Sequence, residues 1–326
     1  MAKYIITGAA GFIAHRIAEM LLEEGHSVIG VDNMNDAYDV RMKEHRLQLL
    51  SNYPAFHFHR QDISDKDTVL ALAGEAEGAS AVINLAARAG VRASVDDPWV
   101  YVDTNMTGTL NLLELCRQVG IPKLVLASTS SIYGQDAPLP TPETASSSLP
   151  LQPYAASKKG AEAMAHAYHF LYGIDVTVVR YFTVYGPAGR PDMVMFRFAK
   201  WLVDDEPLHL NGDGSQSRGF TYVDDIARGT IQALRPLGYQ IINLGGHEVI
   251  TIKQLIALME EITGKQSEII YHPFPKADML SNQADTSKAM ELLGWQPQVS
   301  LRKGVSEMVQ WYLDQHDWAK DLDVGL

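Results

Sequence analysis

Two side chains of the segment PYAASKKGAE, Tyr154 and Lys158, have the types and the spacing to move a proton. Residues four apart lie on the same face of a helix. An ammonium group favours the charged form of a nearby phenol, so we expect Lys158 to lower the pKa of Tyr154 from about 10. The phenol would then serve as a base toward an alcohol or sugar hydroxyl. Alone, such a pair is more often a solvated helix face.

A run of hydroxyl side chains strengthens the catalytic interpretation. Ser128, Thr129, Ser130 and Ser131 end the apolar segment KLVLAST, which predicts a strand over 123–129. The carboxyl ends of parallel strands are where α/β proteins form their ligand sites. A hydroxyl of this run could share a substrate proton with Tyr154, so we interpret the phenol, the ammonium group and the hydroxyl run as one set.

A glycine-rich turn lies near the start of the chain, in TGAAGFIAH (7–15). It follows a predicted strand over 3–7 and precedes a predicted helix over 12–25, the context in which such a turn binds a dinucleotide. Gly8 permits the tight turn, and Gly11 lets backbone N–H groups approach a pyrophosphate at the helix N-terminus. Ala14 stands at the third glycine position, where close packing of the helix is the only requirement and alanine is accepted. The alternative is a tight turn without a ligand.

Asp32 specifies which dinucleotide the turn would bind. It ends the predicted strand over 26–32, about 20 residues after the glycines, where a carboxylate accepts the adenosine ribose 2′-hydroxyl. A carboxylate there repels a 2′-phosphate, which favours NAD over NADP. Asp32 could instead only cap a turn. Asp62, at the end of the predicted strand over 56–62, is a weaker candidate for the adenine.

The rest of the first half alternates apolar strands with helical segments. Further strands are predicted over 81–87 and 176–182, and further helices over 40–50, 99–119 and 155–172. This alternation is typical of a parallel sheet covered on both faces, so we predict an α/β, Rossmann-type doubly wound domain over 1–183. Pro187, Gly189 and Pro191 then break the pattern. We expect a smaller C-terminal α/β substrate lobe over 184–326, with loose residues after Trp318. Part of 220–244 should pack back on the sheet, with a helix over 221–235 and a strand over 239–245.

Composition limits the partners. The 326 residues carry a formal net charge of −12, which repels nucleic acid and anionic membranes. No run reaches the roughly 18 apolar residues of a membrane helix, and the first predicted strand begins almost at Met1. Cys116 is the single cysteine, and His57 and His59 alternate on a predicted strand without a carboxylate cluster. We therefore expect a cytoplasmic protein with no disulfide, no metal, and no nucleic-acid or membrane partner.

Taken together, the motifs resemble the extended short-chain dehydrogenase/reductases that act on nucleotide sugars. The resemblance extends over nearly the whole chain and rests on TGAAGFI, YVDTN (101–105), STSSIYG (128–134), YAASK, RYFTVYGP (180–187) and RGFTYVDD (218–225). Three segments are most similar to the UDP-glucuronate 4-epimerases of that family: VDNMNDAYDVRMKEHRL (31–47), LAARAGVR (85–92) and TVYGPAGRPDM (183–193).

The resemblance implies a role for each matching position. Tyr154 would be the base, Lys158 would bind the nicotinamide ribose and tune the tyrosine, and Thr129 would be the hydroxyl partner. The NAD site would include Gly8, Gly11, Phe12, Ile13, Asp32, Asn33, Asn35, Asp62, Ile63, Leu85, Ala86, Ala87, Asn105, Tyr181 and Val184. The nucleotide-sugar site would include Arg88, Ser130, Ser131, Thr183, Arg190, Gln216, Arg218 and Asp278.

The implied reaction inverts C4 of UDP-glucuronate through a 4-keto sugar. A guanidinium group makes bidentate bonds to phosphate or carboxylate, so Arg218 is expected at the diphosphate and Arg190 at the hexuronate carboxylate. Arg190 could instead be a second diphosphate ligand or part of a loop salt bridge. The family also implies a homodimer through the long helices over 99–119 and 155–172.

Other activities stay open. The chain could epimerise UDP-glucose or UDP-N-acetylglucosamine, or bind NAD without turnover as a regulator. Dehydration needs an Asp-Glu pair and decarboxylation a glutamate just after the catalytic hydroxyl, and Ser130 and Ser131 argue against both. Three departures bear on sugar specificity: Arg88 replaces a more usual glutamine, PFPKADM (273–279) lacks the usual Pro-Gly-Asp pattern, and Asn282 or Gln283 replaces an aromatic residue or threonine.

Overall fold

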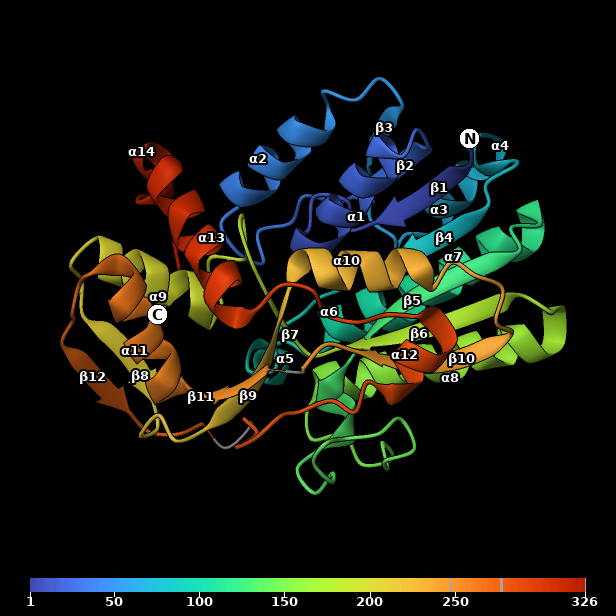
Figure 1. The fold of residues 1–326 in the computed structure, drawn as a ribbon. Coiled ribbons are helices and arrows are strands. Elements are labelled where there is room, and N and C mark those ends of the chain that lie inside the picture. The colour runs from blue at the N-terminus through green and yellow to red at the C-terminus, as the bar shows by residue number, and fades with distance from the viewer. Residues whose placement is uncertain (247, 276–277, 326) are drawn as a thin grey trace.

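The computed structural model describes residues 1–246, 248–275 and 278–325 (Figure 1). A large parallel sheet with helices on both faces forms one part of the molecule. A smaller lobe of short strands and helices forms the other, at the left of Figure 1. Within the described residues, no helix combines the length and the hydrophobicity needed to cross a bilayer.

The large sheet confirms the predicted doubly wound α/β fold. Its seven strands run in the order β10-β6-β5-β4-β1-β2-β3, and every neighbouring pair is parallel. The order reverses direction between β1 and β4, which is the switch point where α/β sheets bind ligands. The strands are β1 (Lys3–Thr7), β2 (Ser27–Asp32), β3 (Phe56–Arg60), β4 (Ala81–Asn84), β5 (Lys123–Thr129), β6 (Asp175–Tyr181) and β10 (Tyr239–Leu244).

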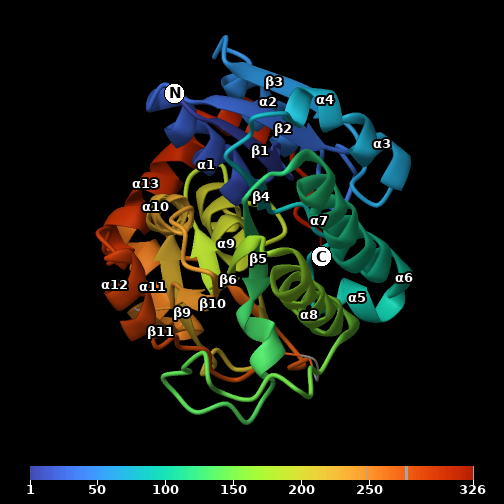
Figure 2. The same cartoon turned by 90° about the vertical axis from the view of Figure 1, so that its right-hand side faces the viewer.

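Helices bury both faces of the sheet because successive strand residues point to opposite sides. Ile5 of β1 belongs to a core shared with one layer of helices, and Ile6 to a core shared with the other. Figure 2 shows α3, α7 and α8 on one side of the sheet and α1, α10 and α12 on the other. Their bounds are α1 (Phe12–Glu23), α3 (Lys66–Ala71), α7 (Gly108–Val119), α8 (Pro153–Tyr172), α10 (Val223–Gln232) and α12 (Ser287–Leu293); α2 (Arg41–Leu50) and α4 (Ala73–Ala76) complete this part.

The predicted helix over 99–119 is confirmed in its bounds, but it is not an α-helix throughout. The structure has α5 (Ala93–Asp96), α6 (Trp99–Tyr101), a π-helical segment η1 (Val102–Thr107) and then α7. A π turn inserts one residue into the helix and rotates the following side chains, and such turns are frequent at functional sites. Here the turn contains Asn105, whose contacts are described below.

The smaller lobe has its own core. Strands β7 (Thr183–Tyr185), β9 (Ser217–Tyr222) and β11 (Glu248–Thr251) form one sheet, and β8 (Leu208–Asn211) pairs with β12 (Ile269–His272). Helices α9 (Val194–Val203), α11 (Ile252–Thr263), α13 (Leu301–Asp314) and α14 (His316–Ala319) complete it. Leu322 and Val324 are buried in this core, so the expectation of loose residues after Trp318 is wrong. The domain boundary at residue 183 stays a prediction, although α10 and β10 lie with the large sheet.

Candidate active site

One continuous cleft of about 930 Å³ lies at the carboxyl ends of the parallel strands and extends into the smaller lobe. Every residue predicted for the NAD, catalytic and sugar sites lines it, except Asn105 and Arg88. Segments from both halves of the chain therefore meet where the sequence analysis placed the chemistry. Within the described residues, no group of three or more histidine, cysteine or acidic side chains is arranged to hold a metal ion.

The glycine turn is shaped by contacts that leave no space for side chains. Gly8 has a φ of +70°, and its N–H donates to the carbonyl of Val31 at 2.7 Å. A Cβ on Gly8 would lie 2.8 Å from the backbone nitrogen of Ala86, and one on Gly11 would lie 2.8 Å from the carbonyl oxygen of Gly8. Gly11 caps the N-terminus of α1, where backbone N–H groups favour a phosphate. Ala14 lies on α1 and is buried in the core between this helix and the sheet, so its methyl group is accommodated at the third glycine position.

Asp32 lies at the expected end of β2, and the structure adds a partner that the sequence analysis missed. One carboxylate oxygen accepts the N–H of Ala10 at 3.2 Å, and the other accepts that of Met34 at 2.8 Å. The Lys43 ammonium lies 3.7 Å from this carboxylate and donates to Asn35 at 3.1 Å. Burial lowers the pKa of Lys43 and the charge of Asp32 opposes that shift. The sequence feature that could have revealed this partner is the position of Lys43 on the predicted helix over 40–50, which follows Asp32.

The second carboxylate of the cofactor end, Asp62, is fixed by neighbouring polar groups. Its oxygens accept from the Ser64 hydroxyl at 2.6 Å and from Asn33 Nδ2 at 2.7 Å. Burial would raise the pKa of Asp62, but the hydrogen bonds from Ser64 and Asn33 outweigh it and lower the pKa. Asp62 is therefore an ionised acceptor in the same cleft as Asp32.

The predicted catalytic set comes together at the junction of β5, η2 (Ser130–Tyr133) and α8. Thr129 caps η2, with its hydroxyl oxygen accepting the N–H of Ser131 at 3.2 Å. The Thr129 side chain lies near enough to the Tyr154 phenol to lower its pKa. Tyr154 and Lys158 lie one helical turn apart near the start of α8, and Lys158 is only 4% exposed.

The pKa values differ from the prediction. Burial raises the pKa of Tyr154, and the opposing effects come from Thr129 and from the positive charge of Arg190. The expected lowering below about 10 by Lys158 is therefore wrong for this structure, because desolvation of the phenolate outweighs the favourable contacts. Burial also lowers the pKa of Lys158 to about 8, with the charge of Glu162 opposing it.

A buried ion pair supports the catalytic set from behind. Glu162, one turn beyond Lys158 on α8, accepts from Arg180 Nε at 2.9 Å and Nη2 at 2.7 Å. The same carboxylate accepts from the Ser128 hydroxyl at 2.7 Å. Both charged side chains are 1% exposed. This bidentate pair, with the Ser128 contact, links α8 to the ends of β5 and β6. It thereby fixes the positions of Thr129 on β5 and Lys158 on α8 relative to each other.

Asn105 and Arg88 are the two predicted residues outside the cleft lining. The Asn105 side chain accepts the N–H of Arg88 at 2.9 Å and donates to its carbonyl at 3.1 Å and to Ser157 at 2.9 Å. Asn105 thus fixes the backbone of the loop that follows β4, whose residues Ala87 and Ala89 do line the cleft. Asn105 makes these contacts with the Arg88 backbone from within the π turn η1.

Arginines gather at the other end of the cleft. Arg218 donates to the carbonyls of Ser217 at 2.8 Å and Met279 at 2.7 Å, and Arg92 forms an ion pair with Asp278 at 2.7 Å. Burial lowers the pKa of Arg218, and the charge of Asp278 opposes this shift. Arg92 was missed by the sequence analysis, although it ends the quoted segment LAARAGVR. In the segment 273–279, residues 276 and 277 lie outside the described residues.

Arg190 lies between the arginine end and the catalytic set. Its Nε and Nη2 donate to the carboxylate of Asp192 at 3.0 and 2.6 Å, the loop salt bridge that was an open alternative. Its guanidinium also lies 5.3 Å from the Tyr38 ring centre, and its positive charge lowers the pKa of the Tyr154 phenol.

A further arginine, Arg197, was also missed by the sequence analysis; it lines the cleft and donates to the carbonyl of Val324 at 2.8 Å. Nothing local in its helical segment marked it as a cleft residue.

Comparison with known proteins agrees with this geometry. Residues 4–245 match the model of the NAD dependent epimerase/dehydratase family. The chain belongs to this family. The match begins in β1 and ends just after β10, so it spans all seven strands of the large sheet.

Individual members of the family are similar over their whole length. A protein named UDP-glucuronate 4-epimerase from Thermodesulfobacterium geofontis is 53% identical over 325 residues, covering 99% of this chain and 100% of that protein. The crystal structure of a UDP-glucuronic acid 4-epimerase from Bacillus cereus with UDP-glucuronic acid and NAD has a TM-score of 0.90 and 36% identity, over 96% of this chain and 99% of that one. A UDP-glucose 4-epimerase from Thermotoga maritima with UDP-glucose also reaches 0.90, at 33% identity and the same coverage.

Proposed function

We propose that the protein is an NAD-dependent UDP-glucuronate 4-epimerase that inverts C4 through a 4-keto sugar. The observation that carries the proposal is the position of Arg190, a cationic side chain close enough to Tyr154 to affect the pKa of the phenol. A hexuronate whose C4 hydroxyl meets Tyr154 has its carboxylate on the neighbouring carbon. The 53% identity to a protein named for this activity supports the same substrate.

The cofactor end fits NAD. The crowded Gly8 and Gly11 and the N-terminus of α1 suit a pyrophosphate, and the Asp32 carboxylate suits an unphosphorylated ribose. Asp32 is 6% exposed and already positioned by two backbone N–H groups. NAD+ bound there supplies a hydride acceptor for the sugar C4 and returns the same hydride, so the overall reaction needs no external oxidant.

Tyr154 manages the proton of the reaction. As phenolate it accepts the proton of the C4 hydroxyl while C4 loses its hydride, and it returns the proton to the sugar oxygen in the reverse step. Thr129, whose side chain lies near the phenol, can hold the same sugar oxygen. Because burial alone raises the pKa of Tyr154, formation of the phenolate requires positive charge nearby, which Arg190 supplies. We assign the same role to protonated Lys158, one helical turn further along α8.

Inversion requires the sugar to turn over while its nucleotide stays bound. Arg92 and Arg218 converge on Asp278 at the far end of the cleft, in a position to hold a diphosphate. Arg218 is braced by backbone carbonyls, so its guanidinium is preorganised. The 4-keto sugar can then rotate about its diphosphate linkage and present the opposite face for return of the hydride.

Arg190 is assigned to the substrate carboxylate. Among the contacts of the described residues, Asp192 accepts from Nε and Nη2, so Nη1 of Arg190 remains to donate. Asp192 also fixes the plane of the guanidinium. A carboxylate β to a ketone loses CO₂ when its C–C bond aligns with the carbonyl π system, and a carboxylate held by Arg190 and by Ser130 or Ser131 can be kept out of that alignment.

The working assembly is proposed to be a homodimer. Exposed apolar side chains occur at two places on the outer layer of helices: Val95, Trp99 and Val102 lie before α7, and Phe170 and Leu171 lie near the end of α8. Trp99 is 77% exposed and Phe170 79%, which is costly unless another surface covers them.

We also propose a cytoplasmic location. The lone cysteine, Cys116, is buried and unpaired, in keeping with that location.

A comparison of three substrates tests the proposed function. UDP-glucuronate, UDP-glucose and UDP-N-acetylglucosamine are each incubated with the holoenzyme, and the anomeric proton signals are followed by NMR. We expect UDP-galacturonate to accumulate from UDP-glucuronate at a kcat/KM well above that for the neutral sugars. Faster epimerisation of either neutral sugar, or NAD binding with no turnover of any of them, would refute the proposal.

A further inference from the structure

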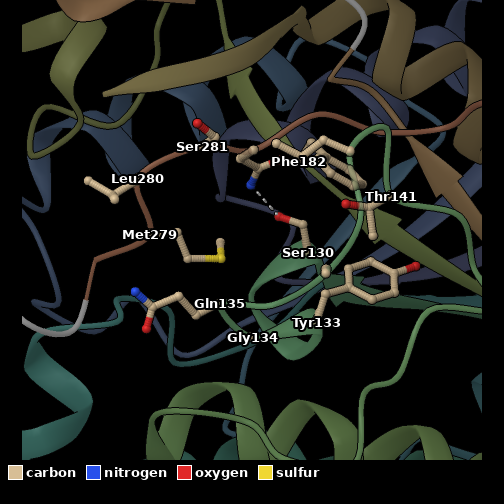
Figure 3. A pocket seen from close by; sticks show the side chains of 12 residues that line it. Ser130, Tyr133, Gly134, Gln135, Thr141, Phe182, Met279, Leu280 and Ser281 are labelled. Carbon is tan, nitrogen blue, oxygen red and sulfur yellow. Dashed lines mark hydrogen bonds between the residues drawn. The ribbon is translucent and has the colours of Figure 1, made fainter. Parts of the chain in front are cut away.

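The side chains that line the sugar end of the cleft are held by segments from elsewhere in the chain. Ser130, for example, accepts a hydrogen bond from Asn282 Nδ2 at 2.9 Å, the dashed line at Ser130 in Figure 3. Arg190 lies on another part of the lining, the loop over 186–193 that connects β7 to α9. This loop is held by Arg46 of α2, which is not among the described residues that line the cleft.

Arg46 is a fully buried cation whose hydrogen-bond donors are all used. It is 0% exposed, and an arginine side chain carries five N–H donors. Nε and Nη2 donate to the carbonyl of Ala188 at 3.0 and 2.8 Å, and Nη2 also donates to that of Gly189 at 3.1 Å. Nη1 donates to the carbonyl of Ala10 at 3.1 Å and to the Tyr38 hydroxyl at 2.8 Å. None of these acceptors is a carboxylate, so the contacts fix a position and do not pair a charge.

The acceptors of Arg46 belong to both ends of the cleft. Ala10 lies in the glycine turn at the cofactor end, where its own N–H donates to Asp32 at 3.2 Å. The other two carbonyls belong to the loop at the sugar end and come directly before Arg190. A single planar guanidinium group therefore ties the loop that carries Arg190 to the glycine turn.

Tyr38 connects Arg46 to Arg190 a second time. The Tyr38 ring centre lies 5.6 Å from the Arg46 guanidinium and 5.3 Å from that of Arg190. A cation within about 6 Å of an aromatic ring is attracted to the ring. Tyr38 lines the cleft, and its hydroxyl is the acceptor of Arg46 Nη1. The Arg190 side chain is therefore linked to Arg46 through this ring as well as through the loop.

The conformation of the loop needs such support. Ala188 has a φ of +52°, in the left-handed region that residues other than glycine avoid. Residues in this region persist only where the surrounding structure holds them, and they cluster at functional sites. The strained residue is held by Arg46, because its carbonyl accepts from both Nε and Nη2. Arg190 follows two residues later, so loss of these bonds would change the direction in which Arg190 leaves the loop.

We propose that Arg46 is a positioning residue for recognition of the substrate carboxylate: it holds the loop before Arg190 against the glycine turn, so that Arg190 is aimed at the sugar. The planar fork of an arginine is required, because a lysine carries three donors on one nitrogen and cannot reproduce all five bonds. The inference rests on the proposed function, which assigns Arg190 to the hexuronate carboxylate, and extends it to a residue outside the cleft lining.

The test compares Arg46→Lys and Arg46→Met with Arg190→Ala and with the double variant Arg46→Lys/Arg190→Ala. Arg41→Met is the matched control, because Arg41 lies on the same helix but is exposed and pairs with Asp39. The Kd values of UDP-glucuronate and of UDP are measured by titration calorimetry on NAD-loaded protein, in a Tyr154→Phe background that prevents turnover. The NAD content of the purified protein and Tm are measured as well. Arg46→Lys keeps the buried charge, so it reports on hydrogen-bond geometry even where the methionine variant folds poorly.

We expect Arg46→Lys to weaken UDP-glucuronate binding about five- to tenfold, the range of one hydrogen bond, and to leave the Kd of UDP unchanged. The NAD content should match that of the wild type, because the glycine turn keeps its bond from Gly8 to Val31. The double variant should bind UDP-glucuronate no more weakly than Arg190→Ala alone, because a residue that acts through another is not additive with it. Arg41→Met should change neither Kd.

Three results would overturn the role of Arg46. They are a Kd of UDP-glucuronate in Arg46→Lys that matches Arg41→Met, equal losses of affinity for UDP and UDP-glucuronate, or additive losses from Arg46→Lys and Arg190→Ala. A merely structural role of Arg46 would give the second result together with a lower Tm and a lower NAD content.

Failure of the proposed function is read separately, from turnover of UDP-glucuronate by the wild-type enzyme and from Arg190→Ala. Where the wild type turns over UDP-glucuronate and Arg190→Ala selectively weakens that ligand, any of the three results refutes the role of Arg46 alone. An Arg190→Ala variant that loses affinity for UDP and UDP-glucuronate equally would overturn the carboxylate assignment and, with it, the role of Arg46.

Discussion

The cofactor end and the sugar end of the cleft are built in different ways. The cofactor end relies on backbone groups and on side chains that directly follow strands, such as Gly8, Gly11 and Asp32. The sugar end relies on arginines from separate segments, each anchored by an acidic side chain or by backbone carbonyls. The first end is a product of local chain geometry, and the second of tertiary packing. Substitutions at the two ends of the cleft should therefore impair the protein in different ways.

The largest effect is expected where the two ends meet. Tyr154→Phe removes the proton acceptor but keeps the ring, so turnover should fall by roughly 10²- to 10⁴-fold. Binding of NAD and of UDP should persist, because neither end of the cleft is altered. The variant is checked by kcat for UDP-glucuronate together with titration of both ligands. Near-normal turnover would show that another group carries the proton.

The next prediction concerns the stability of the protein and its dependence on pH. Lys158→Met replaces a buried ammonium by an apolar chain of similar length. In the NAD-free protein burial lowers the pKa of Lys158 from 10.5 to about 8, so below pH 8 the wild type carries a penalty of about 3 kcal/mol. Between pH 8 and 10.5 the unfolded chain binds more protons, so wild-type stability rises with pH and the penalty disappears.

The variant should therefore be more stable than the wild type at pH 7, by an amount that shrinks toward pH 10.5. Chemical denaturation of both NAD-free proteins across this range measures the difference. A difference that stays constant with pH would mean that Lys158 is not desolvated.

At the cofactor end, Gly8→Ala tests the backbone construction. The positive φ of Gly8 costs an L-residue roughly 1–2 kcal/mol, and a methyl group there would collide with Ala86. We expect loss of bound NAD and lower stability, measured by the NAD content of the purified protein and by Tm. Ala14→Gly is the control, because it restores the third glycine and should keep NAD bound. Equal NAD content in the two variants would contradict the described cradle.

At the sugar end, a pair of arginine variants tests the contrast between the two ends of the cleft. We expect the smallest effect of this series here. Arg190→Ala should weaken UDP-glucuronate binding about tenfold or more and leave UDP binding unchanged, as expected for one charge-assisted hydrogen bond. Arg218→Ala should weaken both ligands. Titration calorimetry of NAD-loaded variants measures each Kd. Equal losses of UDP and UDP-glucuronate in Arg190→Ala would assign that arginine to the diphosphate or to the loop.

The same contrast explains what the sequence could predict. All seven sheet strands and the glycine turn follow from apolar runs and local breakers, and the strand over 123–129 matches residue for residue. The π turn at Asn105 was not predicted, because helical periodicity does not register a single inserted residue. Arg92 and Arg197 were missed because only tertiary packing brings them to the cleft.

The pKa of Tyr154 shows a further limit. Spacing placed Tyr154 and Lys158 one helical turn apart on α8, where both line the cleft, but it gave no measure of how deeply the two groups are buried. Desolvation depends on the whole environment of a group, and here it outweighs the favourable charges and raises the pKa of the tyrosine. Positions of functional residues were thus more predictable than their ionisation.

The central claim is a redox-neutral inversion at C4 of a UDP-hexuronate, and a labelled substrate tests it most directly. UDP-glucuronate carrying deuterium at C4 is converted by the holoenzyme in ordinary water, and the product is analysed by NMR and mass spectrometry. We predict UDP-galacturonate with the deuterium retained at C4 and the carboxylate intact. Loss of the deuterium to solvent, or release of CO₂ with formation of a UDP-pentose, would contradict the account.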